Sequence, residues 1–520
     1  MTRTAFAVGK ARSALMLVVA LVAGAAWAST AEAAGDGCAA GAAGAGDPYF
    51  PGYGNGGYDV GRYDLDVAYN PANGNLRGRA KLRARATGTL CSLNLDLLGF
   101  AIKRIRVRNE KARWSRHGQE LTVSPRRPLK RGKRFALTVR YGGVPVEFRD
   151  LVTGVPIGFT PTGDGAVATG QPESAATWFP VNDHPGDKAA YDFEIEVPDS
   201  YGVVANGKPK GTEPGQPGWT VWRWQADAPM ASYLTVLGVG DWDARRWRTA
   251  DGLPVYDAVD STITGAHRTE IDSSLAKQGA ILDFLATEIG RPYPFDTVGA
   301  IVDPERPILF ALETQTRPIY AAIFWLDNSF QPANGDYVVA HELAHQWFGD
   351  DIALRRWRDI WLNEGFATYY EYLWVGAHGG LGPEQLFDAL LAGLPADDPI
   401  WSVEVGDPGP EEMFSDAVYA RGAMTLEALR REVGDRDFGA IVERWARDRA
   451  GGHGTTGQFI RIAEAESGAR LDDLFETWLF TAEKPPTPAT VRAGASGRGD
   501  AAAGRQAIED LRRRLALGAY

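Results

Sequence analysis

At 520 residues, the chain is too long for one ordinary hydrophobic core, so we expect two or three domains. Its composition, with 44% hydrophobic and 23% charged residues, is typical of a globular protein. The net charge of -11 argues against a nucleic-acid partner, because such proteins need a basic face.

The first 28 residues are typical of a secretory signal. Arg3, Lys10 and Arg12 form a basic start, and residues 14–28 are an apolar run that is too short to cross a bilayer comfortably. An uncleaved anchor helix is the alternative. No later segment reaches roughly 18 consecutive apolar residues, so we expect an exported, secreted or extracytoplasmic chain without stable membrane insertion.

Residues 29–47 are rich in Ala and Gly, and we predict that they form a flexible segment. This segment contains Cys38, and the only other cysteine is Cys91. In an oxidising compartment the pair could form a disulfide, which would stabilise the fold by an amount on the order of 4 kcal/mol. The sequence leaves the disulfide open, because a flexible segment need not bring the two thiols together.

The region 48–250 is predicted to be an antiparallel β domain. Apolar and polar residues alternate along 64–69, 135–141 and 192–197, which is the period of a half-buried strand. Turn residues such as Asn206 and Gly207 separate these stretches.

A second domain is predicted over 251–484, where helical spacing replaces the alternation. Apolar residues recur at helical intervals along 271–289, while 298–302 is typical of a buried strand and 310–313 could be another. We expect a helix with Asp336 as its N-cap, a second helix that carries Glu364, and further helices over 384–480. Residues 485–520 are predicted to be a flexible tail with a short helix.

The strongest motif in the chain is H-E-x-x-H, formed by His341, Glu342 and His345, with Glu364 following after eighteen residues. Two imidazoles four positions apart lie on one helix face, so both can bind one metal ion, and Glu364 can supply a third ligand. Three protein ligands leave a position open, as in catalytic zinc sites. Glu342 points about 100° away and can meet a water there. The alternative is an amphipathic helix whose histidines bond to backbone.

Four stretches match motifs of one known family: 341–350 (H-E-L-A-H-Q-W-F-G-D), 361–367 (W-L-N-E-G-F-A), 290–295 (G-x-x-Y-P-F) and 47–60. They resemble the aminopeptidase N-type family of zinc metallopeptidases, within the gluzincins, and especially its secreted bacterial members. The resemblance implies a multidomain α+β fold, with an N-terminal antiparallel β saddle domain followed by a thermolysin-like zinc catalytic domain with a mixed sheet and helices. It also implies one Zn2+ per chain.

The resemblance further implies residues that bind the amino end of a substrate. The family's exopeptidase motif G-x-M-E-N corresponds to residues 310–314, where Glu313 keeps the acid and its neighbours differ. The loop that contains Gln171 and Glu173 resembles the family's Q-x-E loop. Two carboxylates would then clamp a free α-ammonium group by charge-assisted hydrogen bonds. The alternatives are a strand-edge acid at Glu313 and a solvated loop charge at Glu173.

Two more residues receive roles near the metal. Residues 418–423 resemble the family's Y-x-K-G-A segment, with Arg421 in place of Lys, which implies that Tyr419 stabilises the oxyanion of the intermediate. A buried core tyrosine is the alternative. Glu371 lies seven residues after Glu364, two turns along the same helix face, so it could hold the second nitrogen of a ligand histidine. A surface acid would give the same pattern.

The resemblance thus implies a zinc-dependent aminopeptidase in which Glu342 acts as general base on a zinc-activated water. We expect peptides with a free N-terminus as partners, and a monomer. A zinc endopeptidase, an epoxide hydrolase and a non-catalytic binding protein on the same scaffold remain alternatives. Many relatives continue into a helical domain that covers the active site, whereas 101 residues follow Tyr419 here, so we expect two domains and a more open cleft.

Overall fold

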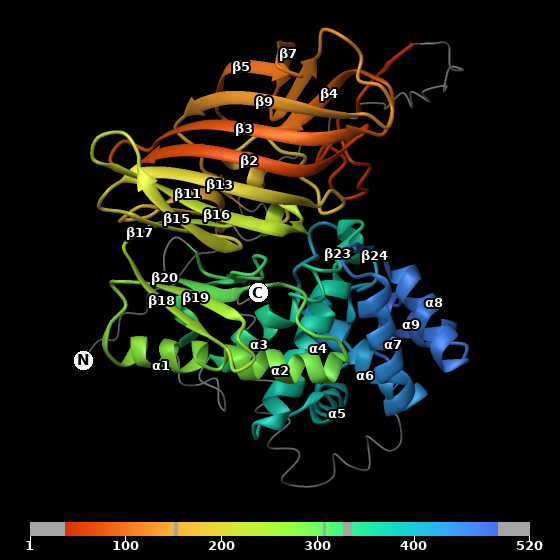
Figure 1. Ribbon diagram of the computed structural model, residues 1–520. Helices are drawn as coiled ribbons and strands as arrows, with labels where there is room; N and C mark the ends of the chain where they lie inside the picture. Colours follow the sequence, from red (N-terminus) through yellow and green to blue (C-terminus); the bar gives the residue numbers. More distant parts are fainter. Residues whose placement is uncertain (1–36, 150–153, 305–307, 326–334, 487–520) are drawn as a thin grey trace, which may run out of the picture. The chain divides into compact units, whose positions relative to one another are not determined.

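The computed structural model describes residues 37–149, 154–304, 308–325 and 335–486. The predicted signal sequence and nearly all of the predicted tail lie outside these ranges. A β-rich part comes first along the chain, and a part with a mixed sheet and helices follows (Figure 1), which confirms the predicted fold class. Among the helices of the described ranges, none has both the length and the apolar character that crossing a bilayer requires.

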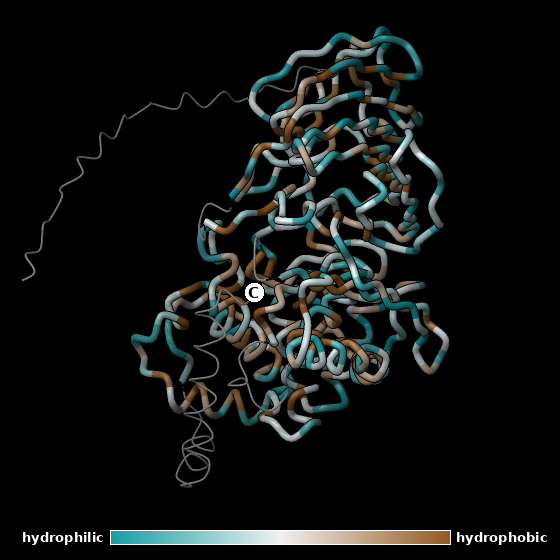
Figure 2. Tube along the Cα trace, turned by 90° about the vertical axis from the view of Figure 1, so that its left-hand side faces the viewer, coloured by the Kyte–Doolittle hydropathy of each residue, from teal (hydrophilic) through white to brown (hydrophobic). Residues whose placement is uncertain are grey.

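The largest sheet is built from stretches of alternating polarity. In β2 (Tyr58–Asn70), Tyr63, Leu65 and Val67 are buried, and the residues between them are only half-buried. Figure 2 shows the same pattern as short hydrophobic and hydrophilic steps along the strands. The strand order is β15 (Lys208–Pro214), β16 (Trp219–Met230), β13 (Ala189–Pro198), β2, β3 (Asn75–Ala86), β9 (Arg134–Gly143), β5 (Ala101–Val107) and β6 (Glu110–Lys111).

One pair in this sheet departs from the predicted antiparallel pattern. Strands β2 and β13 run parallel, whereas the other neighbouring pairs of the eight strands are antiparallel. A parallel neighbour needs a long crossover connection, and more than a hundred residues of chain separate β2 from β13. Alternation of polarity reveals a strand but not the direction of its neighbour.

Two smaller sheets complete the first domain. The four-stranded sheet has the order β1 (Ala39–Ala40), β4 (Leu90–Asp96), β8 (Glu120–Ser124) and β7 (Arg113–His117). The five-stranded sheet has the order β10 (Phe148–Arg149), β11 (Pro156–Pro161), β12 (Ala166–Thr169), β17 (Leu237–Gly240) and β14 (Gly202–Ala205).

Residues 38–47 differ from the predicted flexible segment, because they are fixed to the β domain. Cys38 forms a disulfide with Cys91, and β1 pairs with β4. The buried carboxylate of Asp47 accepts a hydrogen bond of 2.9 Å from the amide of Trp357. Small residues serve close packing here, since a Cβ on Gly41 would lie only 3.1 Å from the backbone of β4. The Ala/Gly-rich composition therefore reflects tight contact rather than mobility in this stretch.

The second domain contains a mixed sheet with the order β18 (Trp242–Arg248), β19 (Pro254–Asp260), β20 (Val298–Asp303), β22 (Ile319–Ala321) and β21 (Ala311–Leu312). The inner pairs β19–β20 and β20–β22 are parallel, and the outer pairs are antiparallel. Since β18 and β19 form a hairpin, the domain boundary predicted at 250–251 falls inside it, and the sheet assigns β18 to the second domain. Strand β18 is mostly exposed, so the polarity of its residues does not show which of the two sheets it joins.

Helices make up most of the remaining chain. The N-cap of α3 (Asp336–Ala344) is Gly335, with a φ of 83° that glycine adopts readily, and Asp336 is the first helical residue rather than the predicted cap. Strands β23 (Ala353–Leu354) and β24 (His453–Gly454) pair in parallel. The helices are α1 (Gly265–Leu275), α2 (Gln278–Ile289), α3 (Asp336–Ala344), α4 (Trp361–Ala377), α5 (Pro383–Gly393), α6 (Gly422–Val433), α7 (Asp435–Asp448), α8 (Thr456–Ser467) and α9 (Asp472–Leu479).

Candidate metal centre

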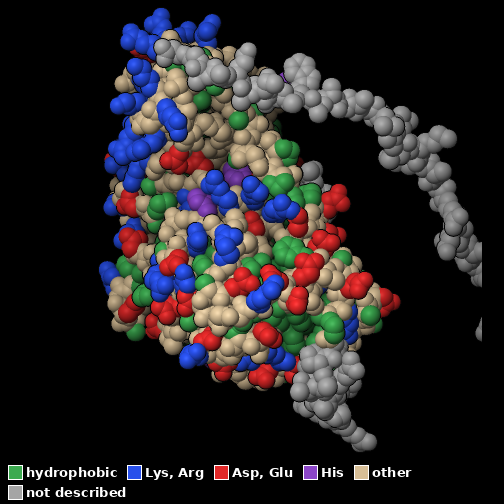
Figure 3. Space-filling model, turned by 90° about the vertical axis from the view of Figure 1, so that its right-hand side faces the viewer, with side chains coloured by type: hydrophobic (Ala, Val, Ile, Leu, Met, Phe, Trp, Pro, Cys, Tyr) green, Lys and Arg blue, Asp and Glu red, His purple; other side chains and the backbone are tan. Residues whose placement is uncertain are grey.

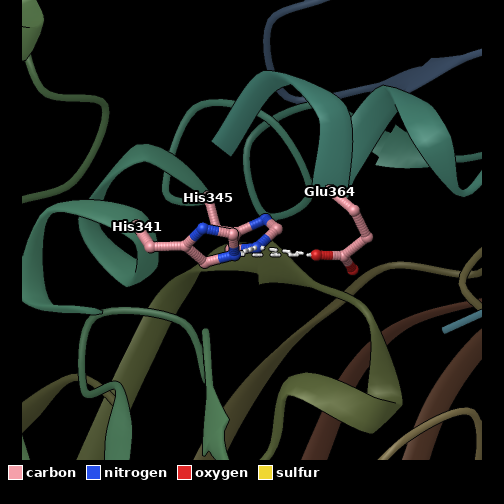
Figure 4. Close-up of side chains that lie close together, drawn as sticks. All are labelled: His341, His345 and Glu364. Carbon is pink, nitrogen blue, oxygen red and sulfur yellow. Dashed lines mark hydrogen bonds and ion pairs between the residues drawn. The ribbon is translucent and has the colours of Figure 1, made fainter. Parts of the chain in front are cut away.

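Two imidazoles and one carboxylate meet where α3 packs against α4 (Figure 4). The Nε2 atoms of His341 and His345 are 3.1 Å apart. The Oε2 atom of Glu364 lies 3.2 Å from Nε2 of His345 and 3.7 Å from Nε2 of His341. All three side chains are buried, so the groups that the H-E-x-x-H spacing predicted as ligands converge on one point inside the protein.

The hydrogen bonds of the two rings show which nitrogen faces that point as an acceptor. Nδ1 of His341 lies 3.2 Å from Oε2 of Glu371, and Nδ1 of His345 lies 3.0 Å from the carbonyl oxygen of Phe348. Because both acceptors require a proton on Nδ1, each neutral ring directs its Nε2 lone pair toward the other ring and the Glu364 carboxylate.

Three lone pairs at this separation repel each other unless a cation lies between them. Nitrogen of His and oxygen of Glu are ordinary zinc donors, and three such donors leave a fourth position for a ligand from solvent or substrate. The second carboxylate oxygen of Glu364 has no hydrogen-bond partner within the described part of the chain. The donor set therefore fits a zinc ion.

Glu371 lies beside the second ring nitrogen of His341. Glu371 is fully buried on α4. Its carboxylate contacts Nδ1 of His341, whereas Nε2 of the same ring faces the other two donors. His345 is oriented instead by a backbone carbonyl three residues further on, a partner that no side-chain motif could reveal. Both rings are thus held in the tautomer that metal binding needs.

Glu342 lies beside this centre but is not one of its three donors. With Glu313 and His345 it forms a second cluster, whose ligand atoms lie within 4.8 Å of one another. Burial raises the pKa of the Glu342 carboxyl to about 8, an effect that His341 and His345 partly offset. A carboxyl group with a pKa near neutrality is suited to accepting a proton and giving it back. For Glu364 the balance is opposite, because the two imidazoles outweigh burial and lower its pKa.

A frame of hydrogen bonds from both domains holds Glu313. The hydroxyl of Tyr233 donates to Oε1 of Glu313 over 3.1 Å, and Nε2 of Gln346 donates to the Glu313 carbonyl oxygen over 3.0 Å. Oε1 of the same Gln346 accepts from the amide of Thr316 over 2.8 Å, and Oγ1 of Thr316 accepts from the amide of Gly207 over 2.8 Å.

Thr316 adopts a φ of 65°, which is costly for a β-branched residue, so its partners hold it in a strained conformation. The surrounding charges also act on Glu313: burial raises its pKa, His345 acts against this, and Glu364 adds to it. The acid is therefore fixed in position by its neighbours rather than free at a strand edge.

Tyr419 lies in a π-helical turn, η6 (Ala417–Arg421), that directly precedes α6. Its buried ring faces the ring of His341, with centroids 6.2 Å apart and planes at 30°. Gly365 and Gly422 permit the close approach of α4 and α6 beside it, because a Cβ on Gly365 would lie 2.9 Å from the Gly422 backbone. Arg421 is directed away from the metal centre and donates to backbone carbonyls, so its role is structural.

Two family domains are recognised along the chain. Residues 60–234 match the Peptidase M1 N-terminal domain, and residues 273–478 match the Peptidase family M1 domain, so the matches together cover more than half of the chain. The chain belongs to peptidase family M1. Its structure is similar to that of the M1 zinc metallopeptidase from Deinococcus radiodurans, with a TM-score of 0.75 and 28% identity, covering 86% of this chain and 99% of that one.

Curated M1 relatives are longer than this chain. Human aminopeptidase N is 30% identical over 292 residues, which are 51% of this chain and 29% of that protein. Leucyl aminopeptidase from Saccharolobus solfataricus is 26% identical over 460 residues, which are 84% of this chain and 55% of that protein. The chain therefore spans about half or less of the curated relatives it matches. Membership of this family of zinc metallopeptidases implies one catalytic zinc ion, in agreement with the donor set.

The two residues assigned from the M1 Q-x-E loop lie in the β domain. Glu173 is buried, and the hydroxyl of Tyr53 donates a hydrogen bond to its Oε1 atom. Burial raises the pKa of Glu173 to about 8, against the effect of that hydrogen bond. Its Oε2 atom and the side-chain oxygen of Gln171 have no hydrogen-bond partner among the described residues. Glu173 is not one of the carboxylates clustered around His345 in the described ranges.

A series of aromatic contacts links Glu173 to Glu313. The ring of Tyr53 stacks on Phe50 at 4.8 Å, the ring of Phe50 meets the edge of Trp357 at 6.4 Å, and Trp357 meets Tyr233 at 5.2 Å. Tyr233 then donates to Glu313. A continuous row of aromatic side chains from both domains therefore lies between the two acids.

Sequence reasoning missed Tyr233, Gln346, Thr316 and Lys188. Nζ of the half-buried Lys188, from the β domain, donates to the backbone carbonyls of Asp350 and Asp351 over 2.7 and 2.8 Å. The signals in the sequence were that Gln346 directly follows the second histidine and that Thr316 lies three residues after Glu313. Tyr233 and Lys188 are brought to the site by contacts between segments that lie far apart in the chain.

Proposed function

We propose that this protein is a zinc-dependent aminopeptidase that hydrolyses the N-terminal peptide bond of peptides. The observation that carries the proposal is the cluster of Glu313, Glu342 and His345, whose ligand atoms lie within 4.8 Å of one another. An acid that is buried beside the metal donors but is not one of them is suited to binding an ammonium group. An endopeptidase has no use for such an acid, because its substrates present no amino group there.

The residues act on the peptide in the following way. When bound by His341, His345 and Glu364, zinc supplies a Lewis acid that polarises a carbonyl and lowers the pKa of a water. Glu342 accepts the proton of the attacking water at its carboxylate and later passes it to the departing amine nitrogen. The Tyr419 hydroxyl donates to the oxygen that gains negative charge, which is worth a few kcal/mol in comparable sites.

Substrate binding depends on the carboxylates away from the zinc. Glu313 holds the α-ammonium of the peptide. Glu173 and Gln171, whose buried side-chain oxygens Oε2 and Oε1 have no hydrogen-bond partner among the described residues, offer further acceptors from the β domain. The relative from Deinococcus radiodurans supports a peptide substrate, since a glutamate-to-alanine mutant of it is described as bound to a Tyr-Ser-Ala substrate. The proposed partners are peptides with a free N-terminus, and the proposed enzyme is a monomer.

Export is part of the same proposal. The Cys38–Cys91 disulfide supports it, because disulfides persist mainly outside the cytoplasm. Sequencing the N-terminus of the protein from an extracytoplasmic fraction should give a start near residue 29. A cytoplasmic protein that retains residues 1–28 would contradict export without affecting the proposed chemistry.

Aminoacyl-coumarin amides with free and with N-acetylated amino groups test the activity. We expect the free amides to be hydrolysed, the activity to vanish with a chelator, and stoichiometric zinc to restore it. N-acetylated amides should react at least about 30-fold more slowly, because loss of a charged partner costs roughly 2 kcal/mol or more. Equal rates on both series would favour an endopeptidase, and activity that survives the chelator would contradict the zinc assignment.

Replacing Glu371 with Gln should weaken zinc binding while the donors stay in place. The amide keeps the size of the carboxylate but removes the negative charge that supports the His341 ring, so zinc affinity should fall by roughly 10- to 100-fold. Competition with a fluorescent chelator measures the affinity directly. Glu476→Gln, on the exposed side of α9, is the matched control and should leave it unchanged. If Glu371→Gln bound zinc with wild-type affinity, Glu371 would be a buried acid without a role in metal binding.

A further inference from the structure

The net charge conceals a strongly basic region in the β domain. Residues 75–143, from the start of β3 to the end of β9, contain nineteen Lys and Arg but only three Asp and Glu, whereas the whole chain has 55 and 66. All of the acidic excess therefore lies elsewhere in the chain, where 63 acidic residues outnumber 36 basic ones. In Figure 3, blue side chains gather over the upper part of the β domain.

Strand register brings the cations onto one face of the eight-stranded sheet. Inner positions of β3 and β9 are mostly apolar and buried, whereas Arg or Lys occupies most outer positions of β3 and Arg134 and Arg140 occupy two of those of β9. Arg140 of β9 lies opposite Arg79 of β3 and Arg104 of β5, and Arg134 of β9 lies opposite Arg85 of β3. We call the following exposed residues of β3, β5 and β9 the basic face: Arg77, Arg85, Arg104, Arg106, Arg134 and Arg140.

This arrangement is unfavourable for the protein alone. Neighbouring strands lie about 4.8 Å apart, and like charges directly opposite each other destabilise a sheet. Asp64 and Asp66 on β2 pair with Arg79, Lys81 and Arg83 at one edge. The six arginines of the basic face form no ion pair with any described residue, although Asp59 of β2 lies opposite Arg85. Solvent and salt screen their mutual repulsion, and a bound anionic surface would relieve it further.

Exposed apolar side chains lie around the same strands. Trp114, Val144 and Val146 are 44%, 56% and 39% exposed, and with Leu309 they are the only large hydrophobic residues classed as exposed in the described ranges. Val144 and Val146 directly follow β9. Trp114 lies on β7, two residues after Ala112. The amide of Ala112 donates a hydrogen bond to the carbonyl oxygen of Ile105 on β5. Exposed Trp and aliphatic side chains on a domain with a basic face are typical of a surface that meets lipid headgroups. A soluble polyanion such as a nucleic acid could stack on the indole, but it offers the two valines less than a lipid layer does.

We propose that the basic face binds the surface of a membrane that contains anionic lipids, with Trp114, Val144 and Val146 entering the headgroup layer. The arginines supply the attraction, and the apolar residues add contact at the rim. The interaction is peripheral, since it uses an exposed sheet face rather than a spanning segment. It is independent of the peptidase chemistry, and it would hold the enzyme at a membrane surface while its metal centre remains in the aqueous phase.

Co-sedimentation with vesicles tests the proposal on the full mature chain. Vesicles of 70% phosphatidylcholine and 30% phosphatidylglycerol should bind the protein in about 50 mM salt, and pure phosphatidylcholine vesicles should not. Binding should fall steeply in about 500 mM salt, because exposed charges are screened. Each basic-face arginine near the surface contributes about 5-fold in affinity, so R85Q/R104Q/R134Q/R140Q should lose roughly 600-fold.

A second quadruple variant controls for net charge. R436Q/R447Q/R461Q/R470Q removes four exposed arginines from the helical domain and should bind the vesicles like the wild type. Both variants should hydrolyse peptides normally, and the basic-face variant should melt no lower than the wild type, because it removes repulsion. Equal loss in both variants, equal binding to neutral vesicles, or binding to duplex DNA without binding to vesicles would overturn the proposal.

Discussion

Glu342→Gln should retain zinc and lose nearly all turnover. The amide has the size of the carboxylate, and Glu342 is not one of the three donors that converge at Nε2 and Oε2, so metal binding should persist. Glutamine cannot accept the proton of the attacking water, and removal of a general base typically costs between roughly 10²- and 10⁴-fold in rate. Turnover of a free aminoacyl amide, measured together with zinc content by elemental analysis, tests this.

Measuring the zinc content of the variant separates loss of the general base from loss of the metal. Glu476→Gln makes the same chemical change on the exposed side of α9 and should leave both turnover and zinc content unchanged. If Glu342→Gln contains a full complement of zinc and keeps more than a small fraction of wild-type turnover, another group supplies the base. Loss of zinc together with turnover would instead indicate a part in holding the metal.

The centre of the site could be predicted because its residues lie at helical intervals. His341 and His345 are one turn apart, and Glu364 and Glu371 are two turns apart on α4. Each pair therefore shares a helix face before any tertiary contact forms. Residue spacing alone does not predict that α3 packs against α4. The resemblance to the family motifs predicted that contact.

The frame around Glu313 could not be predicted, because its contacts join distant segments. Tyr233 lies 80 residues before Glu313, and Gly207 lies 109 residues before Thr316. No periodicity connects such positions, and a left-handed φ at a threonine contradicts local preference. The parallel pairing of β2 with β13 could not be predicted either, because the two strands also lie far apart in the chain. Local patterns give the elements, while contacts between the two domains give the position of Glu313.

The Arg421 position shows the limit of a motif match. The segment 418–423 resembles a catalytic motif, yet only Tyr419 faces the metal donors, and the neighbouring guanidinium is turned toward backbone carbonyls. A π-helical turn changes which side chains share a face, so ordinary helical spacing would misplace them. Residues within one motif thus need separate structural assignment.

Glu313→Gln should remove the preference for a free amino group rather than the hydrolytic chemistry. The variant keeps the shape of the side chain and its hydrogen bond from Tyr233, but it loses the charge that pairs with an α-ammonium group. Losing one partner of a buried charge pair costs about 2–5 kcal/mol, or roughly 30- to 5,000-fold in kcat/KM for free aminoacyl amides. Rates on N-acetylated amides should hardly change, so the ratio between the two series measures the effect.

Tyr233→Phe separates charge from position in the same assay. It leaves the Glu313 carboxylate intact and removes only the hydroxyl that orients it, so kcat/KM on free amides should fall by about 3- to 30-fold, with most of the preference for a free amino group preserved. A structural role for Glu313 would instead lower rates on both substrate series together in Glu313→Gln. A collapse of the ratio in Glu313→Gln alone requires an ammonium group bound at this carboxylate, and it would separate an aminopeptidase from an endopeptidase on the same zinc donors.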